Sequence, residues 1–144
     1  MTISTAAAEN NLLKVKDIKD FLANNQENML TLTFPEYLMM LLQQKKRKRA
    51  DVVRDSGLEK AYVYQIFNGE KKPSRDKLIA LAFGLHLNVE ETQRMLKLGG
   101  CSELYARVPR DAVIMFAIQR NMDIIATDEL LYNNDYATLL DPDK

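Results

Sequence analysis

Residues 49–69, RADVVRDSGLEKAYVYQIFNG, constrain the fold of this chain more than any other stretch. They predict two short helices, Ala50 to Ser56 and Lys60 to Asn68, with Gly57 in the turn between them. Gly is favoured there because it enters the left-handed backbone region without a steric penalty. Two short helices joined by so tight a turn form a helix-turn-helix, whose second helix can enter the major groove of DNA.

The rest of the chain also predicts helices, because β-branched alternation is scarce and Gly and Pro lie at boundaries. Thr33, followed by Pro35 and Glu36, has the residue types of a capping box, so a helix is expected from there to about Lys48. No internal repeat is evident. Further helices are expected over 11–24, from the N-cap Ser74 to Leu85, over 89–98, over 102–108, over 112–118 with Asp111 as its cap, and over 124–132, with a last turn at 135–140.

The expected fold class is therefore all-α. We divide the chain into an N-terminal arm and amphipathic helix at 1–28, a helix-turn-helix domain at 29–100, and a C-terminal helical extension at 101–144 that packs on the domain or dimerises.

Charge is strongly segregated along the chain, although the formal net charge is zero. The window 45–77 has 11 basic and five acidic residues, a net charge of +6, and the remainder of the chain is −6. Phosphates respond to the local patch within a Debye length of about 8–10 Å, so overall neutrality does not argue against a polyanion. The asymmetry predicts nucleic acid as a partner.

Several classes of function lack support in the sequence. The single His and the single Cys form no recognisable nucleophile–base pair and no metal-ligand spacing, and no Gly-rich phosphate loop occurs, so we expect neither an enzyme nor a cofactor or metal site. No apolar run approaches the roughly 20 residues of a membrane span, and the N-terminus lacks the pattern of a signal peptide. A cytoplasmic location is the default expectation.

The second short helix is predicted to be amphipathic. Successive residues step by about 100°, which places Val63, Ile66 and Phe67 on one side. The other side has an ammonium, a methyl group, a phenol and amides, which can pair with guanine, thymine and adenine edges in the major groove. These residues are Lys60, Ala61, Tyr64, Gln65 and Asn68.

From Phe34 to Leu98 the chain resembles the Cro/lambda-repressor-like family of helix-turn-helix proteins, the XRE type. The resemblance rests on the helix-turn-helix, on NGEKKPS at 68–74 and on LIALAFGLHLNVEE at 78–91. It implies a compact five-helix domain that binds double-stranded DNA, commonly as a dimer on a palindromic operator. The chain departs from the family pattern at Arg49, Val53, Glu59 and Phe67.

Carried over by position, the resemblance implies that Lys60, Ala61, Tyr64 and Gln65 read base edges. It also puts Arg49, Asn68, Lys71 and Lys72 near phosphates. Lys46 and Lys48, which precede the motif, flank the same groove and are expected to contact phosphates too.

We therefore expect a sequence-specific DNA-binding regulator of transcription, of bacterial or phage type. The alternative is an antitoxin-like or adaptor protein that uses the same scaffold to bind another protein, because fold does not fix function. A homodimer and a protein partner bound through 101–140 both stay open.

Overall fold

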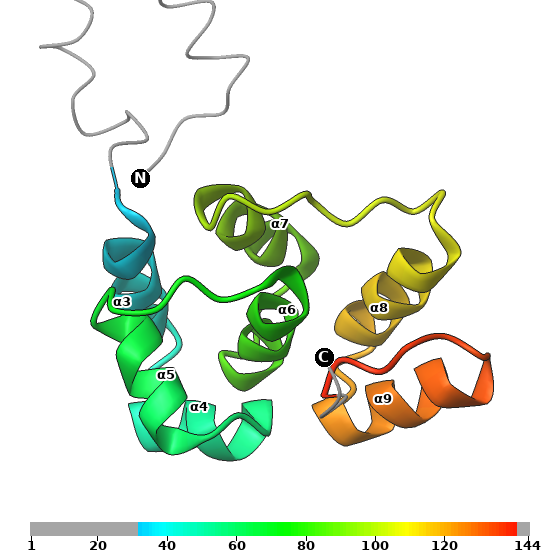
Figure 1. Cartoon of the computed structure of the whole chain (residues 1–144), viewed down its shortest axis with the longest axis horizontal. Coiled ribbons are helices and arrows are strands. Elements are labelled where there is room, and N and C mark those ends of the chain that lie inside the picture. Colours follow the sequence, from blue (N-terminus) through cyan, green and yellow to red (C-terminus); the bar gives the residue numbers. More distant parts are fainter. Residues whose placement is uncertain (1–31, 141–144) are drawn as a thin grey trace, which may run out of the picture. The chain divides into compact units, whose positions relative to one another are not determined.

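The computed structural model describes residues 32–140 of the 144-residue chain (Figure 1). Regular structure in this range is α-helical, with no strand, so the all-α prediction is confirmed there. The helix predicted over 11–24 lies outside the described residues. The helices are α3 (Phe34–Gln44), α4 (Arg49–Ser56), α5 (Lys60–Phe67), α6 (Arg75–Gly84), α7 (Val89–Leu98), α8 (Pro109–Gln119) and α9 (Ile124–Asn133).

The helix-turn-helix segment folds within one residue of the expected bounds at each end. Gly57, the first of the three residues between α4 and α5, has φ = 73°, the left-handed conformation that the turn was expected to need. The capping box at the start of α3 also forms: the Glu36 N–H donates to Thr33 Oγ1 over 3.3 Å, and the Thr33 N–H donates to Glu36 Oε1 over 3.1 Å.

Helix α3 ends earlier than predicted, at Gln44 rather than near Lys48. Lys46 has φ = 53°, and the Arg47 N–H donates back to the Leu42 carbonyl over 3.0 Å, which closes a Schellman motif. The basic run is therefore a connection between two helices. Every described helix except α4 ends with this same hydrogen-bond pattern and one left-handed residue. In chain order these residues are Lys46, Gly69, His86, Gly100, Asn121 and Asp135.

The helix predicted over 102–108 does not form, because side chains bind the backbone groups that a helix would pair internally. The Leu104 N–H donates to Gln93 Oε1 and its carbonyl accepts from Gln93 Nε2, each over 2.7 Å. The Arg75 guanidinium donates to the carbonyls of Ser102 and Glu103, each over 2.9 Å. The segment is therefore an extended connection between α7 and α8.

Asp111 is not the N-cap that the sequence predicted. Helix α8 begins at Pro109, with Val108 as its N-cap, so Asp111 lies within the first turn. Its buried carboxylate accepts two hydrogen bonds from Arg75, over 3.1 and 2.8 Å, and one from the Tyr105 N–H over 3.1 Å. Asp111 therefore joins α8 to α6 instead of capping a helix.

The first three described helices pack on α6 and α7: α4 lies against α5 and α6, and α3 lies against α5 and α7. Helices α4 and α6 approach most closely at Gly84. A Cβ there would lie 2.8 Å from the Val52 carbonyl oxygen and 2.8 Å from Ser56 Cβ, so only Gly fits. Residues 78–85 are all buried, which makes α6 the centre of the core.

The helix pairs α6–α7 and α8–α9 form an internal repeat, although the sequence had shown no evident repeat. Residues 75–104, the first repeat, match residues 110–139, the second repeat, at a constant offset that takes Arg75 to Arg110. Both units are a helix, a short turn, a second helix and an extended tail that ends on a buried Leu, either Leu104 or Leu139.

Equivalent residues have the same structural roles in the two repeats. His86 and Asn121 both have φ = 55° at the end of the first helix. Asn88 and Asp123 are the next N-caps, with side chains that accept from the Glu91 N–H over 2.8 Å and from the Ala126 N–H over 2.7 Å.

Two further pairs of hydrogen bonds recur at the same offset. The buried hydroxyls of Thr92 and Thr127 donate to the N-cap carbonyls over 2.7 and 2.8 Å. Arg75 Nε donates to a tail carbonyl over 2.9 Å, and Arg110 Nε does the same to Ala137 over 2.9 Å. Because these roles are shared while most side chains differ, the repeat is visible in the structure rather than in the sequence.

The repeats bind each other reciprocally. Arg75 Nη2 lies 2.8 Å from Asp111 Oδ2, and Arg110 Nη1 lies 3.0 Å from Asp76 Oδ1. Helix α6 contacts α9 as α7 contacts α8. This exchange is the pattern of a two-fold interface, here within one chain. It fixes the second repeat against the helices that hold the helix-turn-helix.

Candidate nucleic-acid interface

Helix α5 has the two sides that its sequence predicted. Val63, Ile66 and Phe67 are buried, with exposed fractions of 0%, 1% and 3%. Lys60 and Ala61 are exposed, and the two remaining predicted base-reading residues, Tyr64 and Gln65, are partly exposed. The helix thus presents a mixed polar face outward while its apolar side anchors it to the core.

The N-terminus of α4 meets this outward face. The Arg49 guanidinium carbon lies 5.7 Å from the centre of the Tyr64 ring and 5.8 Å from that of Phe67, and Lys60 Nζ lies 5.7 Å from the Tyr64 ring. All three are cation–π distances, at which an aromatic face attracts a cation. The structure therefore brings Arg49, Lys60 and Tyr64 together as one cluster of cations on an aromatic ring, which we call the Tyr64 cluster.

Part of the basic window is occupied by the fold itself. Lys45 Nζ lies 2.8 Å from Glu91 Oε1 on α7. Arg47 forms an ion pair with Asp55 and donates to the Gly84 carbonyl over 3.1 Å. Arg54 and Arg75 are also ion-paired. Lys45, Arg47 and Arg75 thus link different elements, whereas Arg54 pairs within α4. A polyanion could bind any of the four only by competing with an internal ion pair.

The other cations of the window have no ion pair within residues 32–140. They include every charged side chain that the sequence assigned to DNA. They are Lys46, Lys48, Arg49, Lys60, Lys71, Lys72 and Lys77.

The cations after α5 lie apart from the Tyr64 cluster. Asn68 caps α5, and the chain reverses at Gly69, where φ = 78°. Lys71 and Lys72 are exposed and line a pocket of about 260 Å³ with residues at the end of α7, such as Leu98. No hydrogen bond, ion pair or cation–π contact links Lys46, Lys48, Lys71 or Lys72 to the cluster in the described part of the chain.

Sequence reasoning missed the ionic network on the opposite end of α4. Asp55 accepts from both Arg54 and Arg47, and His86 Nε2 lies 3.1 Å from Asp55 Oδ2. The hydrogen bond from Arg54, helped by Arg47 and opposed by desolvation, holds the pKa of Asp55 below its ordinary value of 3.8. The network joins α4 to the α6–α7 turn, a long-range pairing that residue spacing did not reveal.

Two other classes of site find little support in residues 32–140. No three His, Cys, Asp or Glu side chains there are grouped as a metal ion would require. No helix in this range is both long and apolar enough to cross a membrane.

Comparisons with protein-family models, with curated proteins and with solved structures found no match to this chain.

Proposed function

We propose that this protein is a sequence-specific DNA-binding regulator of transcription, of bacterial or phage type, whose helix α5 enters the major groove. One observation supports this most: the cations flanking the outward face of α5 have no acidic partner in the described residues, whereas neighbouring cations are ion-paired. Cations left unpaired beside an amphipathic helix are free to displace the counterions of a phosphate backbone.

The side chains on α5 suit direct readout. Gln65 can form two hydrogen bonds with adenine, Lys60 can donate to guanine, and the Ala61 methyl can contact the thymine methyl. Tyr64 adds a phenol that the Arg49 and Lys60 cations hold in place. Phosphate contacts are proposed for Lys46, Lys48, Arg49, Asn68, Lys71 and Lys72.

The finer architecture belongs to the same proposal. We assign the five helices α3 to α7, within 29–100, to a lambda-repressor-like domain. The extension from 101, which includes α8 and α9, then serves packing against α6 and α7 or dimerisation. A protein partner for 101–140 is the remaining role for that region.

Selection from a random double-stranded DNA library tests the proposal. The full chain is expected to return a sequence motif, with two half-sites about 10 bp apart if it binds as a dimer. Binding repeated at two salt concentrations should weaken steeply as salt rises. Recovery of no motif, with weak and salt-sensitive retention only, would favour the antitoxin-like or adaptor function instead.

A matched pair of Gln variants sharpens that test. Gln65→Ala is expected to lose about 1–3 kcal/mol of discrimination at one base pair of the selected motif, because it removes a bidentate contact. Gln119→Ala changes an exposed Gln on α8 and is expected to leave the motif unchanged. A motif that is unaltered in Gln65→Ala would remove Gln65 from the base-reading set.

A further inference from the structure

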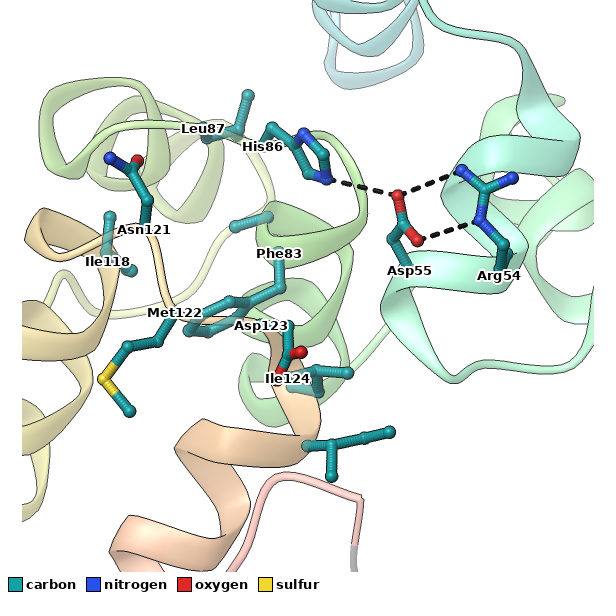
Figure 2. A pocket seen from close by; sticks show the side chains of 12 residues that line it. Arg54, Asp55, Phe83, His86, Leu87, Ile118, Asn121, Met122, Asp123 and Ile124 are labelled. Carbon is teal, nitrogen blue, oxygen red and sulfur yellow. Dashed lines mark hydrogen bonds and ion pairs between the residues drawn. The ribbon is translucent and has the colours of Figure 1, made fainter.

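A pocket of about 520 Å³ lies where α4, the α6–α7 turn and the α8–α9 turn meet (Figure 2). This volume falls in the range of about 300–1,000 Å³ that is typical of small-molecule sites. The pocket is separate from the outward face of α5, because none of its lining residues belongs to that helix.

Both repeats contribute equivalent residues to its walls. Phe83 is the counterpart of Ile118, and Leu87 is the counterpart of Met122. Phe83, Leu87 and Ile118 are buried but keep exposed fractions of 6–7%, and Ile124 adds a fourth buried side chain. The floor of the pocket is therefore apolar.

The cations at the rim are ion-paired. Figure 2 shows Arg54 turned toward Asp55, and the Arg54 guanidinium forms ion pairs with Asp55 and Asp51. Asp55 also pairs with Arg47. The Asp123 carboxylate caps α9, where it offsets the positive end of the helix. No unpaired cation is left at the rim to attract an anionic ligand, and the one carboxylate without a cationic side-chain partner there is Asp123.

Two polar groups at the rim keep free hydrogen-bonding atoms. The Asn121 amide has no partner within residues 32–140. His86 faces Asp55 through Nε2, and a carboxylate can only accept, so Nε2 bears the hydrogen. In the neutral imidazole Nδ1 is then an acceptor, and the Asn121 amide oxygen is a second acceptor at the rim.

We propose that this pocket binds a small molecule with an apolar body, an N–H or O–H donor and no negative charge. The apolar body lies on Phe83, Leu87 and Ile118, and the donor bonds to His86 Nδ1 or to Asn121. Because Arg54 and Asp55 belong to α4, a bound molecule also contacts the helix-turn-helix. An effect of such a ligand on DNA binding rests on the proposed function, whereas binding itself does not.

Three probes with the same ring system test the proposal without DNA: indole, tryptamine and indole-3-acetate, which are neutral, cationic and anionic. Titrations are followed by the methyl signals of Ile118 and Met122. Indole and tryptamine are expected to saturate these shifts, and each should bind at least about fivefold more tightly than indole-3-acetate. Equal or tighter binding of indole-3-acetate, or no saturable shift at these methyl groups, would overturn the proposal.

Three Gly variants then test the rim. His86→Gly and Asn121→Gly remove one polar side chain each at φ = 55°, a conformation that Gly tolerates best. Each should weaken indole binding about three- to tenfold. Asp135→Gly makes the same kind of change at φ = 65° away from the pocket and should have no effect. Unchanged binding in both rim variants, or an equal loss in Asp135→Gly, would contradict the assignment.

Discussion

The two repeats share a backbone plan but differ in what covers them. In the first repeat, α4 packs on α6 and α3 packs on α7, and every residue from 78 to 85 is buried. In the second repeat, the equivalent helix α8 leaves Phe116 43% exposed, with the Arg120 guanidinium carbon 4.6 Å from its ring centre. Phe116 is the counterpart of the fully buried Leu81. The same unit thus supports a helix-turn-helix in one copy and an open helix face in the other.

The outer faces of the second helices differ as well. Glu90 and Lys97 of α7 are replaced by Ile125 and Tyr132 of α9, which are 73% and 74% exposed. The outer face of α7 is thus charged and well hydrated. The outer face of α9 instead exposes two large apolar side chains to solvent. Caps and turns therefore maintain the repeated unit, while its surface residues differ between the two copies.

The largest expected effect tests how the repeats are joined. Arg75→Ala leaves the Asp111 carboxylate, which is only 4% exposed, without its ion-pair partner, and should cost about 3–5 kcal/mol of unfolding free energy. Arg110→Ala affects the more exposed Asp76 and should cost about 1–2 kcal/mol. Urea denaturation of both variants measures the difference. Equal losses would show that the two reciprocal ion pairs are equivalent despite their different burial.

A smaller effect tests whether the repeats are energetically alike. Thr92→Val and Thr127→Val each remove one buried hydroxyl that donates to an N-cap carbonyl, and that carbonyl keeps its backbone hydrogen bond. Each variant should lose about 0.5–1.5 kcal/mol, and the two losses should agree closely. The measurement is again urea denaturation. A loss confined to one Thr would break the equivalence of the repeats at this position.

The smallest effect concerns the ionic network that only the first repeat makes with α4. The pKa of Asp55 is lowered in the folded state, so its stabilisation is present above the ordinary value of 3.8 and is lost as pH falls through the lowered folded pKa. Asp55→Asn should therefore be less stable than wild type at about pH 6, with a gap that shrinks by about pH 3.

Thermal unfolding across this range measures that gap. Asp135→Asn is the control, because Asp135 is exposed and has no ion pair in the described range. Its difference from wild type should not vary in the same way. A gap for Asp55→Asn that grows toward low pH would contradict the sign of the shift.

Local signals accounted for much of the fold. The capping box at Thr33, the turn at Gly57 and the N-cap at Ser74 were all predicted, because each depends on residues within one helical turn. The early end of α3 has a local cause, the left-handed Lys46, but the other failures depended on long-range contacts. The helix expected over 102–108 was lost to side chains of Gln93 and Arg75, which lie far away in the sequence.

The candidate site was likewise predictable only where it depends on local geometry. The helical phase of α5 correctly separated its buried side from its outward side, since that follows from local geometry. Which cations were free did not follow from spacing. Lys45 and Arg47 stand in one run with Lys46 and Lys48, yet they pair with Glu91 and Asp55 of other elements. The repeat was missed because few of its residues are identical, as Thr92 and Thr127 are, and its common features are mainly backbone roles such as that of the left-handed His86.

We propose above that DNA is bound by helix α5 and the cations that flank it, all of which lie in the first half of the described chain. The most direct measurement is the dependence of the DNA-binding constant on salt for two charge-removal variants. Lys71→Ala removes an exposed cation after α5, and Arg107→Ala removes an exposed cation between the repeats that has no ion pair in the described range. The slope of log K against log salt should fall by about 0.9 in Lys71→Ala and stay unchanged in Arg107→Ala. An unchanged slope in Lys71→Ala, or an equal reduction in Arg107→Ala, would contradict the claim.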